Sequence, residues 1–326
     1  MKNILLITLL MISTSSFSQF FNKSEPFAHT YSIVARDSIT GEMGVAVQSH
    51  WFSVGSSVTY GKSGVGVVAT QSFINPSYGP KGLALMEQGL SPQQALDALL
   101  QNDEGEMYRQ VAFLNADGEV ATHTGSSCIE AAGHQQGKNF SAQANMMLNN
   151  TVWDAMADAF ETTKGNLSTR ILAAMKAAQA EKGDIRGMQS AAILIVSGTA
   201  TGNSWEDTLM DLRIEDHENP IAELERLVHL HTAYNFMNDG DLAMEDGDSK
   251  KAEALYLEAQ NMIPYNLEMK YWYAINLLNN KEYKKAAPIL KIIFKADENW
   301  RILTPRLVKS GLLIISEDEL EKVMEL

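Results

Sequence analysis

The chain has 326 residues, 45% of them hydrophobic and 20% charged, which exceeds the ~100–200 residues usual for one domain and predicts two domains with separate cores. The formal net charge of -14 excludes a basic nucleic-acid-binding class, because such binding requires Lys and Arg clusters that neutralise phosphates. The single cysteine, Cys128, excludes an intramolecular disulfide framework.

The first residues have the layout of a secretory signal peptide. Lys2 precedes an apolar stretch from Ile4 to Ile12, and small polar residues continue to Ser18. We therefore expect a signal peptide over residues 1–19 and a short leader over 20–29; the alternative is an amphipathic or buried first helix. No interior run approaches the ~18 apolar residues of a membrane span. The sequence predicts a soluble exported protein, periplasmic or extracellular.

Three runs with strand patterning come next, at residues 31–35, 43–47 and 65–69. Apolar residues alternate in each run and glycines separate them, so we expect adjacent strands. Residues 37–41 carry Asp, Ser and Gly, which favour a turn between the first two runs. A hairpin is the expected result.

Two helices and a second hairpin are predicted after these strands. Helical spacing covers residues 82–89 and 91–100, the second with a serine cap before proline. Strands at 109–114 and 119–123 flank Asn115-Ala116-Asp117-Gly118, a strong turn signal.

The last part of this domain is predicted to be two amphipathic helices, at 152–162 and 167–180, followed by a buried strand at 190–196. Strands thus alternate with helices along residues 30–218. This order fits two stacked sheets between helical layers, an α+β fold.

Residues 219–326 have a wholly helical pattern with a repeat. Lys250-Lys251-Ala252 recurs as Lys284-Lys285-Ala286, a period of about 34 residues that is typical of tetratricopeptide motifs. Small, aromatic and proline positions of that motif fall at Gly240, Ala252, Tyr256, Ala259 and Pro264. We expect a small all-α tetratricopeptide-like domain of about two repeats, docked on the first domain or contacting a protein partner or a second copy in a homodimer.

Spaced motifs over some two hundred residues of the first domain resemble one family. They are Thr30-Tyr31-Ser32-Ile33-Val34-Ala35-Arg36-Asp37, Gly44-Val45-Ala46-Val47-Gln48-Ser49, Ala69-Thr70-Gln71, Asn75-Pro76-Ser77-Tyr78-Gly79-Pro80, His123-Thr124-Gly125, Cys128, Gly133-His134, Gln143 with Asn145-Met146, Gly183-Asp184, Arg186-Gly187, Gln189-Ser190, Asp211-Leu212-Arg213 and Asp216-His217. The family is the domain of unknown function 1028, a bacterial group with an N-terminal-nucleophile (Ntn) hydrolase-like fold. The resemblance implies a four-layer αββα sandwich.

An Ntn hydrolase uses the hydroxyl of its first residue as nucleophile and its free α-amine, of reference pKa ~7.7–8.0, as base. By resemblance Thr30 stands at that place, with Ser49 and His50 as further candidate catalytic residues. Gln48 lies about where proteasome-like enzymes carry an aspartate, and Lys62 approximately where they carry a lysine. The alternative is that Thr30 is an ordinary strand threonine, because a leader left ahead of it would keep its nitrogen an amide.

The other candidate site residues, among them His123 and Cys128, would bind a small-molecule or peptide-like substrate. Arg186 could hold a carboxylate oriented by Asp184, or the two could form an internal ion pair. Asn75 and Tyr78 lie on a turn-rich loop suited to polar recognition, or to a plain turn. Gln48 and Asn145 belong to matched segments.

His123, Cys128 and His134 suggest a metal site or a catalytic thiol, but their spacing does not form a compact zinc motif. A buried small apolar role for Cys128 and polar anchoring of a loop by His123 and His134 are the alternatives. We expect neither a metal nor a cofactor.

Two functions fit this sequence. The first is an exported amidohydrolase that cleaves an amide or peptide-like bond through Thr30. The second is a non-catalytic binding protein on the same fold, whose helical tail recruits a protein partner.

Overall fold

The structure is a computed structural model that describes residues 27–28 and 30–326. The predicted signal peptide and most of the leader lie outside the described residues. The chain divides into two compact units, of which the first ends at Asp211 and the second runs from Leu212 to Leu326. Each unit has its own hydrophobic core.

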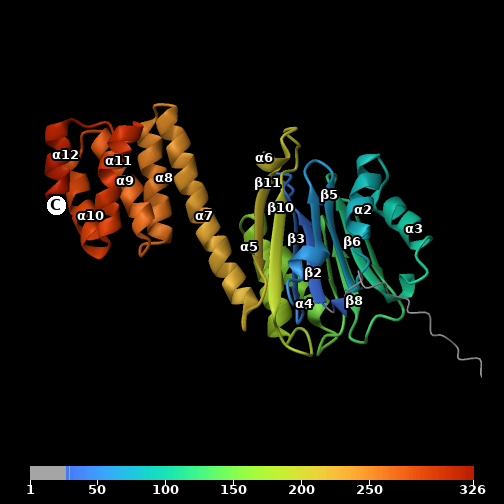
Figure 1. The fold of residues 1–326 in the computed structure, drawn as a ribbon. Helices are drawn as coiled ribbons and strands as arrows, with labels where there is room; N and C mark the ends of the chain where they lie inside the picture. The colour runs from blue at the N-terminus through green and yellow to red at the C-terminus, as the bar shows by residue number, and fades with distance from the viewer. Residues whose placement is uncertain (1–26, 29) are drawn as a thin grey trace, which may run out of the picture. The chain divides into compact units, whose positions relative to one another are not determined.

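The first unit contains two antiparallel sheets (Figure 1). One has six strands, in the order β11 (Thr208–Ile214), β10 (Ser190–Val196), β3 (Met43–Ser49), β2 (Thr30–Arg36), β9 (Phe140–Ala144) and β8 (Gly133–Gly137). The other has the order β1 (Phe27–Ala28), β5 (Gly66–Phe73), β6 (Arg109–Asn115) and β7 (Val120–Thr124), with β4 (Thr59–Lys62) also paired to β5. The predicted hairpin of the first two runs is β2–β3, but the third run, β5, belongs to the other sheet and is not their neighbour.

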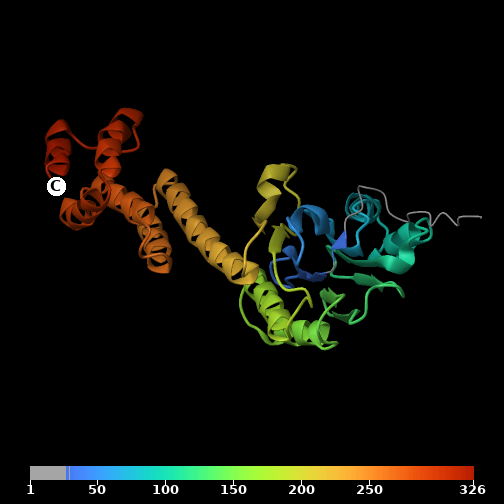
Figure 2. The ribbon, with the colours of Figure 1, turned by 60° about the horizontal axis from the view of Figure 1, so that its bottom comes forward.

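Helices cover the outer face of each sheet. Two of them, α2 (Tyr78–Glu87) and α3 (Pro92–Leu100), contact β5, β6 and β7, while α4 (Val152–Thr162) and α5 (Leu167–Ala180) contact the six-stranded sheet. Figures 1 and 2 show the two sheets between these helices. Three short helices complete the unit, α1 (Gly55–Val58), the 3-10 helix η1 (Glu106–Tyr108) and α6 (Ser204–Asp207).

Local sequence accounts for the turns and caps. Asp37 Oδ1 accepts hydrogen bonds from the N–H groups of Ile39 (2.8 Å) and Thr40 (3.0 Å), and Gly41 takes a φ of 78°, which closes the β2–β3 hairpin as predicted. Ser91 and Gln94 cap α3 reciprocally. Helix α2 begins four residues earlier than predicted, because Pro80 falls in its first turn, where no backbone N–H is needed.

The space between the sheets is apolar in one part and polar in another. Val34, Val47, Val67 and Ala112 belong to a buried cluster between the sheets. These four residues lie on β2, β3, β5 and β6. Successive side chains on a strand point to opposite faces, so every second residue along each of these strands also faces inward. Several of those residues are polar, namely Thr30, Ser32, Ser49, Gln71 and Gln110, and Gln143 on the neighbouring β9 is polar and buried as well.

The second unit consists of helices packed around a separate core. They are α7 (Pro220–Glu245), α8 (Ser249–Met262), α9 (Leu267–Asn279), α10 (Tyr283–Ala296), α11 (Glu298–Ser310) and α12 (Glu317–Met324). Helices α8 and α10 have 14 residues each, and α10 begins 34 residues after α8. Ala252, Tyr256 and Ala259 of α8 are buried, as are Ala286, Leu290 and Ile293 at the same spacing in α10.

Candidate functional site

Most of the predicted site residues lie toward one end of the sandwich. At this end β2 begins with Thr30 and β3 ends with Ser49, which is paired with both Thr30 and Ser190 at the start of β10. In the other sheet β5 ends and β6 begins there, with Ser72 opposite Arg109. Lys62 does not share this end, because it pairs with Gly66 at the far end of β5.

Thr30 is fully buried at the head of β2. Its carbonyl oxygen accepts hydrogen bonds from Gln71 Nε2 (3.2 Å), the backbone N–H of Asn145 (3.1 Å) and Asn145 Nδ2 (3.4 Å). Just ahead of it, Phe27 and Ala28 pair with β5 as strand β1. Part of the predicted leader is thus a strand of the second sheet, whereas Thr30 begins a strand of the six-stranded sheet.

Gln71 and Gln110 link the two sheets through side-chain amides. Gln71 Nε2 donates to Gln110 Oε1 (2.7 Å) and lies 3.4 Å from the carbonyl oxygen of Gln143. Gln110 Oε1 also accepts from Asn145 Nδ2 (2.8 Å). Gln71 and Gln110 lie on β5 and β6 of one sheet, whereas Gln143 lies on β9 of the other sheet and Asn145 directly follows β9. These bonds therefore fix the spacing between the two sheets.

Gln110 Nε2 contacts three further acceptors. They are Thr124 Oγ1 (3.0 Å) and the carbonyl oxygens of Gly133 (3.1 Å) and Ala144 (2.9 Å). Thr124 Oγ1 lies 2.8 Å from Nδ1 of His134. Burial, and then the nearby His123 ring, lower the pKa of His134, so the imidazole is neutral near pH 7.

Gln143 extends the network along β9. Its Nε2 donates to Ser32 Oγ (2.6 Å) and its Oε1 accepts from Ser141 Oγ (3.1 Å), which in turn accepts from Thr122 Oγ1 (2.8 Å). All these groups are amides or hydroxyls. They can donate and accept hydrogen bonds, but none of them titrates near neutral pH.

Gln48 lies on the opposite face of the six-stranded sheet from the Thr30 side chain. It pairs with Tyr31, whose hydroxyl donates to Gln179 of α5 (3.3 Å). Gln48 is fully buried, and neither its Oε1 nor its Nε2 has a hydrogen-bond partner among the described residues. The place that the resemblance gives to an aspartate is therefore taken by a buried neutral amide.

Asp184 and Arg186 form the ion pair that the sequence allows. Arg186 Nε and Nη2 approach Asp184 Oδ1 (3.0 Å) and Oδ2 (2.7 Å), and the Asp184 side chain is inaccessible to solvent. The backbone N–H of His50 donates to Asp184 Oδ2 (3.3 Å). The pair thus fixes the loop after α5 against the end of β3, while the Arg186 side chain stays 26% exposed.

Asn75 and Tyr78 contact a second buried ion pair. Arg109 donates to Asp103 through Nε (2.8 Å to Oδ2) and Nη2 (3.1 Å to Oδ1), and through Nη1 to the carbonyl of Phe73 (2.8 Å). Tyr78 Oη (3.1 Å) and Asn75 Nδ2 (3.4 Å) donate to Asp103 Oδ2. Burial, and then the Asp103 charge, raise the pKa of Tyr78, so its phenol stays protonated.

His123 and Cys128 hold the loop around η1. His123 Nε2 lies 2.9 Å from the carbonyl oxygen and 3.2 Å from the carboxylate of Glu106. Cys128 Sγ lies 3.5 Å from the carbonyl oxygen of Arg109, and burial raises the pKa of its thiol. A raised pKa reduces the thiolate fraction, which is the nucleophilic form.

Among the described residues, no three or more His, Cys, Asp and Glu side chains gather in a way that could hold a metal ion. None of the helices in this part of the chain combines the length and apolar character needed to cross a membrane.

The sequence predicted Thr30, Ser49 and Asn145 as site residues, and the structure brings these three together at the end of the sandwich where β2 begins and β3 ends. It places Asp184, Arg186 and His50 in one contact group and Asn75 and Tyr78 in another. Gln110, the centre of the amide network, was missed. Its only sequence signal is a polar residue at an inward position of an otherwise apolar strand.

The comparisons with known proteins give a family and a solved relative. The model of the "Family of unknown function (DUF1028)" matches residues 30–224. The crystal structure of protein SPO2555 from Silicibacter pomeroyi, which carries the same family label, is similar with a TM-score of 0.57 and 31% sequence identity, over 63% of this chain and 89% of that one. No curated protein matches.

Proposed function

This chain belongs to the DUF1028 family, whose function is unknown, and from that premise we propose that it is an exported binding protein without catalytic activity. The sandwich would be an Ntn hydrolase-like scaffold that lacks a working nucleophile. The helical unit would be tetratricopeptide-like and would recruit a protein partner.

The observation that carries this proposal is the position of Thr30 within the chain. An Ntn nucleophile needs a free α-amine as its base, and a peptide nitrogen is not basic. Residues Phe27–Ala28 pair with β5 as strand β1. This pairing gives the segment ahead of Thr30 a place in the second sheet, so its retention would stabilise the sandwich.

The chemistry around Thr30 supports the same conclusion. General acid–base catalysis requires a group that titrates near the working pH. The contacts of Thr30 include the neutral side chains of Gln71 and Asn145, and Ser49 pairs with Thr30 across β2 and β3. Such a set orients a backbone by hydrogen bonds but does not transfer protons.

The offset of 34 residues between α8 and α10, with buried small and aromatic positions at equal spacing, supports the tetratricopeptide-like assignment. Repeats of this kind present side chains from successive helices on a continuous binding surface. A tetratricopeptide-like helical unit would therefore bind a protein partner on this surface.

The mature N-terminus tests the proposal. We expect intact-mass analysis of the protein secreted from its native host, or from a bacterium with the same export route, to give a chain that begins near Gln19. A chain that begins at Thr30 would contradict the proposal.

Amide hydrolysis by Thr30 is the second candidate function. It is favoured by the row of three hydroxyl residues, Thr30, Ser49 and Ser190, that pair across β2, β3 and β10. If a second cut after His29 freed the amine, profiling against amide and peptide libraries should detect turnover that Thr30→Ala abolishes and Thr162→Ala, at an exposed position of α4, does not. Equal turnover by wild type and Thr30→Ala would exclude this mechanism.

A further inference from the structure

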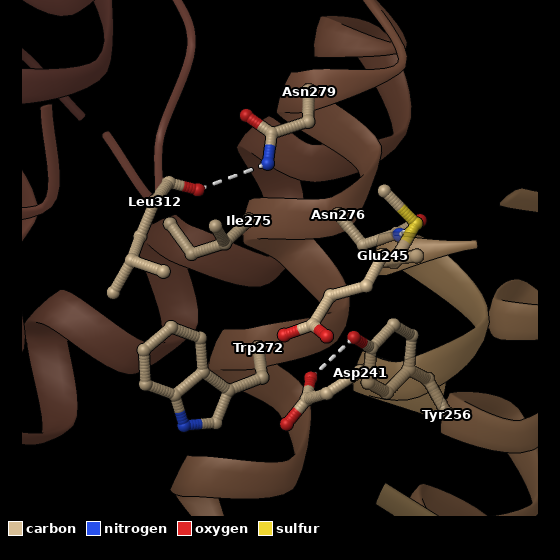
Figure 3. Close-up of a pocket in the computed structure, with 9 residues that line it drawn as sticks. Asp241, Glu245, Tyr256, Trp272, Ile275, Asn276, Asn279 and Leu312 are labelled. Atoms are coloured by element: carbon tan, nitrogen blue, oxygen red, sulfur yellow. Dashed lines mark hydrogen bonds between the residues drawn. The ribbon is translucent and has the colours of Figure 1, made fainter. Parts of the chain in front are cut away.

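The helical unit contains a cavity of about 310 Å³ that the sequence did not predict. Helices α7, α8 and α9 and the segment after α11 line it. Its volume is at the lower end of the ~300–1,000 Å³ usual for ligand pockets. Figure 3 shows the side chains around it.

Two carboxylates line this cavity without a cation to balance them. Asp241 and Glu245 are one turn apart on α7, and neither forms an ion pair among the described residues. Tyr256 Oη donates to Asp241 Oδ1 (2.5 Å), which fixes this carboxylate (Figure 3). No Lys or Arg is among the described lining residues. Like charges at this spacing repel each other, so a bound cation would relieve the repulsion.

The cavity is also lined by an aromatic ring, Trp272, and by an apolar side chain, Leu312. Trp272 of α9 lines the cavity, and an edge-to-face contact with Tyr271, with centroids 5.6 Å apart, fixes the indole. Leu312 is 56% exposed at the same cavity. Indole is the best side-chain partner for a cation, and an exposed leucine suits the methylene groups of a long side chain.

A buried hydrogen-bond donor also faces this space. Asn276 lines the cavity and is only 3% exposed. Its Oδ1 accepts from Asn280 Nδ2 (3.1 Å), but its own Nδ2 donates only to the sulfur of Met244, a weak acceptor. One of the two Nδ2 hydrogens therefore has no acceptor among the described residues. A buried donor of this kind costs free energy until a ligand oxygen or a water accepts it.

We propose that the cavity binds an arginine side chain of an extended segment of a partner protein. The guanidinium would lie between Asp241 and Glu245 and stack on Trp272, and a peptide carbonyl would accept from Asn276. Arginine fits better than lysine, because its planar fork can bond two carboxylates at once and stack on a ring. This inference rests on the proposed recruiting role of the helical unit and names the chemistry of the partner.

Binding to the full-length chain tests the inference. Calorimetric titration with the blocked tetrapeptide acetyl-Ala-Arg-Leu-Ala-amide should give saturable binding that weakens with added NaCl. The lysine version should bind several-fold more weakly, and the glutamate version should not bind. Glu245→Gln keeps the shape of the side chain and should weaken binding by about tenfold, equivalent to about 1.4 kcal/mol. Glu258→Gln, an exposed carboxylate on α8 that does not line the cavity, should bind as the wild type does.

Three outcomes would overturn the inference. They are the absence of saturable binding up to millimolar peptide, equal binding of the arginine and glutamate peptides, and unchanged binding in Glu245→Gln while circular dichroism shows it folded. Light scattering that finds a dimer which Glu245→Gln dissociates would instead assign the cavity to a second copy of the chain. Failure here leaves the test at the mature N-terminus unaffected, so the two proposals can fail separately.

Discussion

Asp103 and Arg109 form a buried, doubly hydrogen-bonded ion pair in the sandwich. Arg109 is 2% exposed, and removing one partner of such a pair leaves a charge in a poorly solvated site, at a cost of about 3–5 kcal/mol. We therefore expect Asp103→Asn to lower the free energy of unfolding of the sandwich by an amount in this range, measured by urea denaturation at pH 7. The matched control is Asp117→Asn, an exposed turn residue, which should change it little.

The effect of Asp103→Asn should also depend on pH. Burial by itself would raise the pKa of Asp103, but hydrogen bonds from the Arg109 side chain and the Gly105 N–H outweigh it and lower the pKa below 3.8. A lowered folded-state pKa stabilises the fold above the unfolded-state pKa, and this contribution is lost as pH falls through the folded-state value. The difference between wild type and Asp103→Asn should be constant from pH 7 to 5 and shrink below about pH 4. A constant difference down to pH 3 would contradict this assignment.

Single residues of the site were predictable only where a motif carried them. Thr30 and Asn145 lie in segments that match the family, and the structure joins them through the Thr30 carbonyl. Gln110 lies within residues 30–224, which the family model matches, but in none of the short motifs that carry the resemblance in the sequence. Its role follows from strand register and inter-sheet contact, and both depend on residues far away in the chain.

The predictions for whole helices and strands succeeded where a hydrophobic period was present. The spans of α4, α5 and β10 coincide with those predicted. The β8–β9 hairpin was missed, because its inward positions carry His134, Ser141 and Gln143 in place of apolar residues. His134 and Ser141 contact hydroxyls of Thr124 and Thr122 on the other sheet, and Gln143 bonds to Ser32 and Ser141 within its own sheet. These inward side chains are thus satisfied without the apolar alternation that indicates a strand.

The contact between α7 and α8 depends on a residue without a side chain. A Cβ on Gly240 would lie 2.8 Å from the ring of Tyr256, and the Tyr256 hydroxyl is held by Asp241. Alanine normally stabilises a helix interior relative to glycine by ~1 kcal/mol, but overpacking costs about 1–3 kcal/mol. We expect Gly240→Ala to lower the melting temperature of the helical unit, measured by circular dichroism at 222 nm.

The neighbouring residue supplies the control for Gly240→Ala. Asp239 is exposed on the same helix, so Asp239→Ala should leave the melting temperature unchanged or raise it slightly. A higher melting temperature for Gly240→Ala would mean that the two helices separate at no cost, and that the small residue is not required for their packing.

The two units have separate cores, which bears on how the whole chain unfolds. The sequence predicted about two helical repeats, too few for independent stability. The structure adds α11 and α12, and residues from α7 to α12, including Leu307 and Val323, join one buried cluster. A core of this extent favours independent folding of the helical unit.

Denaturation of the full chain should therefore show two transitions, each sensitive to one of the two variants. Asp103→Asn should move only the sandwich transition and Gly240→Ala only the helical one, because the substituted residues lie in different units and effects at independent sites add. The five tryptophans assist the assignment, since Trp51, Trp153 and Trp205 lie in the first unit and Trp272 and Trp300 in the second. Phenylalanine at both of the latter positions makes the fluorescence report the sandwich alone. A double variant whose two shifts equal those of the single variants would establish independent units, whereas a single transition moved by either substitution would mean that the units unfold together.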